Sequence, residues 1–142
     1  ALASCTFCYS EDRCCRLPHL RGFWERLSLG RLDIARDWGW APDFVDAMWY
    51  MLQQDAPDDY VIATGESHTL ESFVANTFAY VGLDWRSHVD VDTALFRPSE
   101  IMHSAGNPEK AINGLGWKAE ALFPDLIANL VRAEQTVLVQ KY

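Results

Sequence analysis

Apolar residues recur at helical spacing in three stretches of the chain, and each stretch predicts an amphipathic helix. The first helix begins at Pro42, which suits a first helical position, and ends before Asp55. The second follows Thr69, a predicted N-cap, and stops at Gly82, while the third starts near Pro124. The apolar positions are Phe44, Val45, Met48, Trp49 and Leu52 in the first helix, a buried stripe of Leu70, Phe73, Val74, Thr77, Phe78 and Val81 in the second, and Phe123, Leu126, Ile127, Leu130 and Val131 in the third.

Three shorter runs predict strands. Residues 25–29 alternate and close at Gly30, residues 60–64 form a β-branched run that we expect to be a buried strand stopping at Gly65, and residues 88–91 form the third. A short helix is expected at residues 109–113. The elements predict a mixed α/β fold without internal repeats.

Composition narrows the class of protein. The 142 residues contain 12 Lys+Arg and 20 Asp+Glu, a formal charge of −8, and 49% of them are hydrophobic, which is enough to bury the core of one modest domain. An acidic chain repels phosphate backbones and anionic lipids, so we expect no nucleic-acid or membrane partner. No apolar run is long enough to span a bilayer, and no signal peptide is visible, so the expected compartment is the cytoplasm.

The first segment differs from the rest of the chain. Residues 1–24 are rich in Arg and contain all four cysteines, Cys5, Cys8, Cys14 and Cys15, and we predict that this segment is not part of the fold formed by residues 25–142. Three of the cysteines with His19 could form a zinc shell, which leaves a zinc-dependent module as an alternative. Adjacent Cys14 and Cys15 suit one small site poorly, so no metal site is predicted.

Motifs for cofactor binding and catalysis are missing. Residues 114–119 read Gly-Leu-Gly-Trp-Lys-Ala, but a dinucleotide fingerprint needs a strand before the glycines and a helix after them, whereas here a short helix precedes them. No Gly-x-Ser-x-Gly motif occurs, no Tyr is followed four residues later by Lys, and the four histidines are scattered. We therefore predict no catalytic residue and no bound cofactor in this chain.

Two arginines stand out in this acidic chain. Arg36 precedes the first helix within Ala-Arg-Asp-Trp-Gly, and Arg97 lies at the expected end of a short strand, before Pro98. A guanidinium group offers planar, bidentate donors to phosphate oxygens. The alternative is a purely structural role in an Arg36–Asp37 or an Arg97–Glu100 salt bridge.

The same residues resemble the carboxy-terminal part of the GDP-mannose 4,6-dehydratase family, which belongs to the extended short-chain dehydrogenases. Arg-Asp-Trp-Gly-Trp-Ala-Pro at residues 36–42 and Tyr-Val-Ile-Ala-Thr-Gly-Glu at residues 60–66 are its most specific motifs. Further matches to the family, in its order and at its spacing, lie at residues 29–35, 47–54, 80–85, 96–100 and 115–118. The resemblance implies the carboxy-terminal substrate-binding lobe of an extended short-chain dehydrogenase (Rossmann-type) α/β fold, with the Rossmann core largely missing.

The resemblance also implies a reaction. Such enzymes bind NADP in an amino-terminal Rossmann domain and form homo-oligomers. They take a hydride from C4 of the mannose unit of GDP-mannose, eliminate water across C5 and C6, and return the hydride to C6. The product is GDP-4-keto-6-deoxymannose, a precursor of GDP-fucose. The family's catalytic residues and glycine fingerprint lie upstream of the matching region, so the resemblance implies a truncated chain that holds no NADP and is inactive alone. The alternative is a non-catalytic GDP-sugar-binding or interaction remnant.

By motif position, the substrate-binding residues are assigned as follows. Arg36 and Arg97 would clamp the diphosphate or the ribose side, and Glu100 would orient a sugar or ribose hydroxyl. Leu29, Gly30 and Arg31 would line the nucleotide, with Arg31 standing where the family commonly has Asn.

Overall fold

A computed structural model describes residues 26–140 of the chain. Residues 1–24, with the four cysteines and the candidate zinc ligands among them, lie outside the described residues. The strands are β1 (Leu27–Leu29), β2 (Ala35–Asp37), β3 (Ser67–Thr69) and β4 (Val89–Val91), and the α-helices are α1 (Ala41–Leu52), α2 (Leu70–Tyr80), α3 (Glu109–Leu115) and α4 (Phe123–Gln140). Two short 3-10 helices, η3 (Trp85–Ser87) and η4 (Thr93–Leu95), flank β4.

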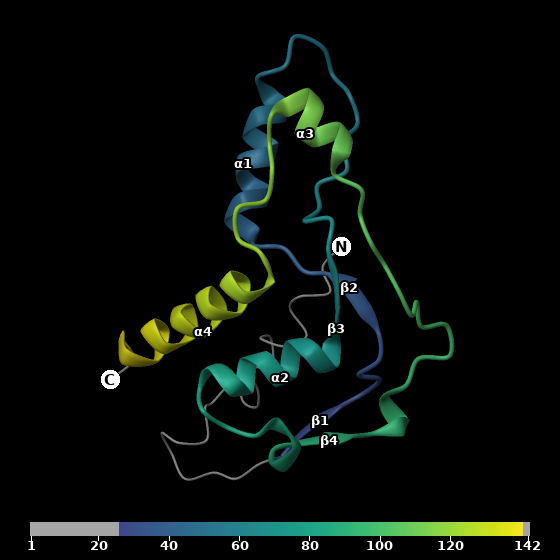
Figure 1. Ribbon diagram of the computed structural model, residues 1–142, viewed down its shortest axis with the longest axis vertical. Helices are drawn as coiled ribbons and strands as arrows, with labels where there is room; N and C mark the ends of the chain where they lie inside the picture. Colours follow the sequence, from purple (N-terminus) through teal and green to yellow (C-terminus); the bar gives the residue numbers. More distant parts are fainter. Residues whose placement is uncertain (1–25, 141–142) are drawn as a thin grey trace.

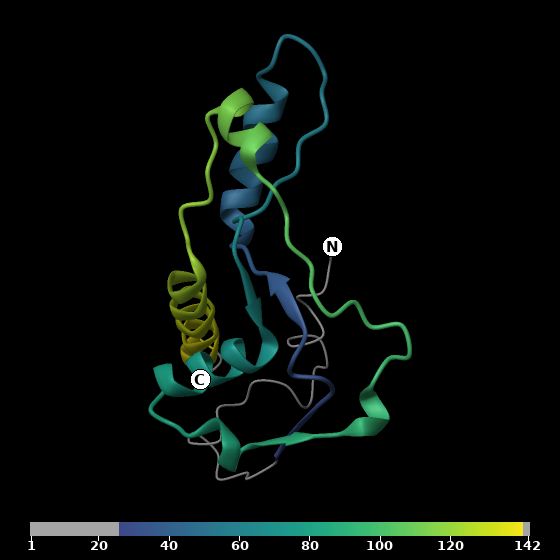
Figure 2. The same ribbon diagram turned by 45° about the vertical axis from the view of Figure 1, so that its right-hand side comes forward.

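The elements form an elongated molecule. Helices α1 and α3 lie side by side at one end, strands β1 and β4 lie at the other, and α2 and α4 lie between them (Figures 1 and 2). Residues 96–108 run from the β1–β4 end to α3, and residues 53–66 lead from α1 back to β3 in the middle of the molecule. The α1–α3 end and the β1–β4 end are therefore built from different parts of the chain.

The sheets are small. β1 pairs with β4 in parallel, with Leu27 opposite Val89, and β2 pairs with β3 in antiparallel, with Arg36 opposite His68. The strands predicted at residues 25–29 and 88–91 correspond to β1 and β4. Two-stranded sheets are marginal alone, so packing against the helices holds them in place.

The strand predicted at residues 60–64 is wrong. This run belongs to no strand, because no segment among residues 26–140 forms a ladder with it. The Thr64 N–H donates instead to the Asp37 side chain, at 3.0 Å. The strand in this region is β3, which starts at Ser67, after Gly65. A β-branched run favours extended backbone, but a strand also needs a hydrogen-bonded neighbour.

The four predicted helices are confirmed, but many of their apolar positions are not buried. In α1, Val45, Met48, Trp49 and Leu52 are exposed, and in the predicted buried stripe of α2 only Phe73 and Val74 are buried. The Thr69 side chain caps α2 by accepting the Ser72 N–H at 3.1 Å. α3 ends at Gly116, whose φ of +65° is left-handed, so the helix precedes the glycines of the Gly-x-Gly-x-x-Ala run. In α4, Leu130 is 40% exposed rather than buried with the other apolar residues of its stripe.

The buried apolar residues form two clusters. One, at the α1–α3 end, consists of Ala47, Ala111, Leu115, Trp117 and Ala119, with Phe44, Met51, Tyr60 and Ile62 packed against it. The other lies between α2 and α4 and consists of Phe73, Phe123, Leu126 and Ile127, with Trp38, Trp40 and Leu70 against it. Trp38 and Trp40 thus contribute to the core.

Two close contacts fix the long connections. The buried Asp43 carboxylate accepts the N–H groups of Glu120 and Ala121, both at 2.9 Å, and the Trp117 indole N–H donates to the Asp43 carbonyl at 3.0 Å. A Cβ added at Gly106 would lie 2.3 Å from the Ala63 Cβ. The connection after Glu100 therefore crosses residues 61–63 with no space for a side chain.

Candidate functional site

The pairing of β1 with β4 brings two loops together. The Asp92 N–H donates to the Leu29 carbonyl at 2.7 Å, so the loop after β1 lies against the start of η4. A Cβ at Gly30 would approach the Leu95 carbonyl oxygen to 3.2 Å, tighter than most such contacts. The half-buried Leu29 and Gly30 therefore lie beside the segment that leads into Arg97 and Glu100.

Arg31 is held by a carboxylate and an aromatic ring. Its Nε and Nη2 donate to the two Asp33 carboxylate oxygens at 3.0 and 2.7 Å, and its Cζ lies 5.5 Å from the centroid of the Phe96 ring. The hydrogen bonds to Asp33, assisted by the charges of Asp33 and Glu100, raise the pKa of Arg31, and those to Arg31 lower the pKa of Asp33. The result is a charged, oriented guanidinium on an aromatic face.

Arg36 pairs with Glu100 across 64 residues of sequence. Its Nη2 lies 2.9 Å from Glu100 Oε1, and its Nη1 donates to the Ala35 carbonyl at 2.8 Å. The two side chains are only 20% and 17% exposed. Backbone bonds hold the two segments together, because the Ala35 N–H donates to the Met102 carbonyl at 2.7 Å and the Ser104 N–H to the Ala35 carbonyl at 3.0 Å.

Neither of the two salt bridges expected from sequence neighbours forms. Arg36 pairs with Glu100 and not with Asp37, and Arg97 makes no ion pair with Glu100. Within residues 26–140, the exposed Arg97 side chain makes no hydrogen bond or ion pair. Arg97 also follows a 3-10 helix, η4, and not the predicted strand.

The three arginines of the site differ in their partners. Arg31 and Arg36 pair with the carboxylates of Asp33 and Glu100, whereas the exposed Arg97 makes no ion pair within residues 26–140. Arg97 is therefore the arginine of this set whose charge is not already matched by a carboxylate. The sequence analysis missed Asp33 and Phe96 as partners of Arg31; the only sequence signal was their nearness to Arg31 and Arg97 in the chain.

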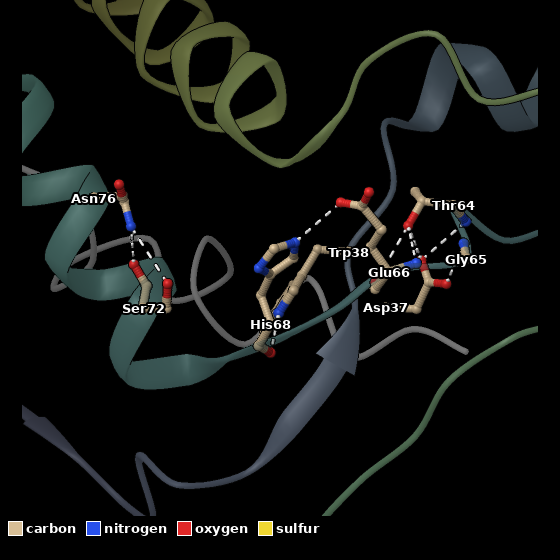
Figure 3. A network of polar contacts seen from close by, with 8 residues as sticks. All are labelled: Asp37, Trp38, Thr64, Gly65, Glu66, His68, Ser72 and Asn76. Atoms are coloured by element: carbon tan, nitrogen blue, oxygen red, sulfur yellow. Dashed lines mark hydrogen bonds and ion pairs between the residues drawn. The ribbon is translucent and has the colours of Figure 1, made fainter.

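A polar network anchors β2, which carries Arg36 (Figure 3). The Asp37 carboxylate accepts the Thr64 N–H at 3.0 Å, the Thr64 hydroxyl at 2.7 Å and the Gly65 N–H at 3.0 Å. The Trp38 indole N–H donates to the His68 carbonyl at 3.1 Å, across the β2–β3 pair. Sequence reasoning also missed this role of Asp37, which follows from the fold and not from a local pattern.

Two features that the sequence raised, a glycine run and metal-ligating side chains, can be located in residues 26–140. The Gly114–Ala119 run closes a helix, and Trp117 within it is buried, so it offers no phosphate-binding turn. Residues 26–140 contain no group of His, Cys, Asp or Glu suited to hold a metal. In the same residues, no helix is long and apolar enough to cross a membrane.

Comparison with known proteins identifies the family. Residues 18–130, more than half of the chain, match the family model of GDP-mannose 4,6 dehydratase. The chain belongs to the GDP-mannose 4,6 dehydratase family. This dehydratase family falls in the lyase class of enzymes.

Curated relatives in this family are much longer. The chain is 48% identical over 110 residues to GDP-mannose 4,6 dehydratase 1 of Arabidopsis thaliana, a match that covers 78% of this chain and 30% of the relative. It is 40% identical over 127 residues to the GDP-mannose 4,6 dehydratase of Homo sapiens, covering 78% of this chain and 34% of the relative. The chain thus spans about a third of the length of the curated relatives it matches.

Solved structures confirm the fold class. A dTDP-glucose 4,6-dehydratase (rfbB) from Bacillus anthracis in complex with NAD aligns over 84% of this chain and 37% of its own, with a TM-score of 0.71 and 19% identity. RMD from Pseudomonas aeruginosa complexed with NADPH aligns over 78% of this chain and 36% of its own, with a TM-score of 0.65 and 19% identity. The chain has part of the α/β fold of the extended short-chain dehydrogenases.

Proposed function

We propose that this chain forms the GDP-mannose-binding lobe of a GDP-mannose 4,6-dehydratase, a cytoplasmic enzyme that makes GDP-4-keto-6-deoxymannose for GDP-fucose biosynthesis. The observation that carries the proposal is the half-buried Arg36–Glu100 pair, with the exposed Arg97 three residues before Glu100, within the family-matched region. The GDP part of the substrate has a negatively charged diphosphate, a planar base and ribose hydroxyl groups. In this proposal the arginines bind the diphosphate, Glu100 accepts a hydrogen bond from a hydroxyl, and residues 29–31 line the nucleotide.

Arg36 is the fixed half of the diphosphate grip. Its bonds to Glu100 and to the Ala35 carbonyl use only some of its N–H donors, so the others remain for phosphate oxygens. Because those bonds hold the guanidinium in one position, little conformational entropy is lost when the anion binds. The low exposure of Arg36 strengthens its attraction for phosphate relative to a fully solvated side chain.

Arg97 and Glu100 complete the polar contacts in this proposal. The exposed Arg97 provides the second cation for the diphosphate or ribose side. Glu100 uses Oε1 for Arg36, which leaves Oε2 to accept a hydrogen bond from a sugar or ribose hydroxyl. Leu29, Gly30 and Arg31 line the nucleotide. The close approach of Gly30 to Leu95 keeps the two loops in contact on this side of the site.

Binding without turnover is the expected behaviour of the chain alone. NADP serves the full-length family protein, and the lack of a fitting phosphate turn in the described residues favours a chain that binds GDP-sugar and does not transform it. A homo-oligomeric assembly belongs to the same proposal, and a non-catalytic GDP-sugar-binding or interaction remnant is the alternative to it.

Calorimetry with GDP-mannose, GDP and guanosine tests the proposal. We expect GDP-mannose and GDP to bind and guanosine to bind at least tenfold more weakly, because only the first two carry the diphosphate. Arg36→Ala and Arg97→Ala should each weaken GDP binding about tenfold, the loss expected for one charged hydrogen-bond partner. Arg132→Ala, in the exposed part of α4, is the matched control and should leave affinity unchanged.

Two results would contradict the proposal. The first is GDP affinity equal to that of guanosine, and the second is an equal loss in the Arg36→Ala and Arg132→Ala chains. A separate assay with GDP-mannose and NADP should give no product from the chain alone, and formation of GDP-4-keto-6-deoxymannose would refute binding without turnover.

A further inference from the structure

The guanidinium group of Arg31 has one edge that no described residue occupies. Its Nε and Nη2 donate to the two carboxylate oxygens of Asp33, at 3.0 and 2.7 Å, so the carboxylate lies along the side of the group that these two nitrogens form. Arg31 makes no other hydrogen bond within residues 26–140. The remaining N–H donors, on Nη1 and Nη2, form the end of the group. The side chain is 37% exposed, so this end is accessible to a ligand.

The free end of Arg31 is held in a fixed direction. The bidentate pair with Asp33 fixes the plane of the guanidinium group, and its Cζ lies 5.5 Å from the centroid of the Phe96 ring. These two contacts restrict the rotation of a long side chain, so less conformational entropy remains to be lost when a ligand binds. The end of the group is therefore preorganised to donate two parallel hydrogen bonds.

The charge of Arg31 is matched, whereas that of Arg97 is not. Asp33 pairs with Arg31, but Arg97 makes no ion pair in the part of the chain that the structure describes. An anionic diphosphate is attracted most by a positive charge that no carboxylate offsets, which favours Arg97 over Arg31 as its partner. What Arg31 retains is the direction of its donors, and directed donors suit a neutral pair of acceptors in a fixed geometry.

Arg31 lies close to the residue that would hold a ligand hydroxyl. The hydrogen bonds and the charge of Asp33 raise the pKa of Arg31 most, and the charge of Glu100 raises it further, so the Glu100 carboxylate is near the guanidinium group. In the proposed function Glu100 accepts a hydrogen bond from a hydroxyl, and residues 29–31 line the nucleotide. With the ribose at Glu100, the base that is bonded to this ribose lies within reach of Arg31.

We infer that Arg31 selects guanine among the nucleobases, by donating hydrogen bonds from Nη1 and Nη2 to O6 and N7 of the base. This bidentate pair is the commonest specific contact of arginine with a base in protein–DNA complexes. Adenine presents N7 as an acceptor on the same edge but an amino group in place of O6, so one hydrogen bond is lost and two donors face each other. The inference rests on the proposed function, because it assigns the base specificity of the same site.

Calorimetry of the full chain with GDP, inosine diphosphate and ADP tests the inference. The three nucleotides have the same ribose and diphosphate and differ only in the base. Inosine diphosphate keeps O6 and N7 but lacks the amino group at C2 of guanine. We expect GDP and inosine diphosphate to bind with affinities within about threefold of each other, and ADP to bind about tenfold or more weakly, the discrimination typical of one bidentate pair.

Variants of the chain assign the preference to Arg31. In Arg31→Met, GDP and ADP should bind with affinities within about twofold of each other, because the paired donors are gone. Asp33→Asn keeps Arg31 but loosens its orientation, so the preference for GDP should become smaller without disappearing. Arg86→Met is the matched control, since Arg86 also lies over an aromatic ring, that of Trp85, but in η3 before β4, and it should keep the full preference. Thermal melting of each variant checks that the chain still folds.

The outcomes distinguish this inference from the proposed function. Equal binding of GDP and ADP by the unmodified chain, with both bound more tightly than guanosine, would overturn the selection of guanine and leave the diphosphate site intact. An unchanged preference for GDP in Arg31→Met would also overturn it. So would inosine diphosphate bound as weakly as ADP, because recognition would then lie at the C2 amino group. GDP and ADP bound no more tightly than guanosine would overturn the proposed function and the inference together.

Discussion

The α1–α3 end and the β1–β4 end are held together by different forces. At the α1–α3 end, the buried Asp43 and Trp117 bond to each other's segments inside an apolar cluster. At the β1–β4 end, Arg26 pairs with Asp90, and Arg31 with Asp33, on half-exposed or exposed surfaces. Buried hydrogen bonds and apolar packing therefore lie at the α1–α3 end, and exposed ion pairs lie at the β1–β4 end.

The difference has an energetic basis. A buried hydrogen-bonding group that loses its partner keeps the full cost of desolvation, whereas an exposed ion pair exchanges one polar surrounding for another. Substitutions of the buried residues at the α1–α3 end should therefore lower the free energy of unfolding, and substitutions of the exposed ion-pair residues at the β1–β4 end should alter charge with little effect on folding.

Among these substitutions, Trp117→Ala should lower the free energy of unfolding most. The side chain is only 4% exposed and packs against Phe44, so its removal leaves a cavity and costs about 3–5 kcal/mol of unfolding free energy. Urea denaturation measures the loss. Trp49→Ala is the matched control, because Trp49 is 58% exposed, and in the chain alone it should cost less than about 0.5 kcal/mol. Equal losses of unfolding free energy in the two variants would contradict the distinction between the buried and the exposed side of α1.

Asp43→Ala should have the next largest effect. The two N–H groups of Glu120 and Ala121 would lose a charged acceptor in a buried place, at a cost of about 2–3 kcal/mol. Asp46→Ala, three residues along the same helix but exposed, should change the unfolding free energy by less than about 0.5 kcal/mol. The same urea titration compares them, and a smaller loss for Asp43→Ala than for Asp46→Ala would contradict the interpretation.

At the β1–β4 end, Arg26→Gln should have the smallest effect on the free energy of unfolding. The Arg26 guanidinium donates to Asp90 at 2.7 Å, and this hydrogen bond holds the pKa of Asp90 below its ordinary value of 3.8. Because the folded pKa is the lower one, the pair stabilises the fold above pH 3.8 and loses that contribution as the pH falls through the lowered pKa. NMR titration of the Asp90 carboxyl should move its pKa upward in Arg26→Gln.

Arg86→Gln is the control for that titration. Arg86 lies over the Trp85 ring, so its replacement should leave the pKa of Asp90 unchanged. Added salt should shrink the stability difference between the Arg26→Gln and unmodified chains, since the pair is solvent-exposed. A pKa of Asp90 that does not respond to Arg26→Gln would contradict this account of the β1–β4 end.

Periodicity predicted the helices well but not their burial. The spacing of apolar residues located α1, and Thr69 located the start of α2, because both signals are local. The buried side of α1 is the side that packs against α3 and Trp117. These residues follow Ala47 by more than 60 positions in the sequence, so the local pattern does not specify the contact. An exposed apolar side of a helix gives the same sequence pattern as a buried one.

The resemblance named residues for the candidate site but not their arrangement in space. The resemblance pointed to Arg36, Arg97 and Glu100, and the structure brings Arg36 and Glu100 together. The two are 64 residues apart, so only the backbone bonds between β2 and residues 102–104 create the pair. For the same reason the run at residues 60–64 gave a wrong strand, since strand formation depends on a neighbour that local sequence does not specify.

The crossing at Gly106 links the two ends mechanically. The connection that carries Glu100 is clamped against Ala63 at a point where even a methyl group would collide, and Ala63 adjoins the run that packs beneath α1. A larger residue at position 106 would push this connection away from Ala63 and so displace the segment that carries Glu100, the partner of Arg36.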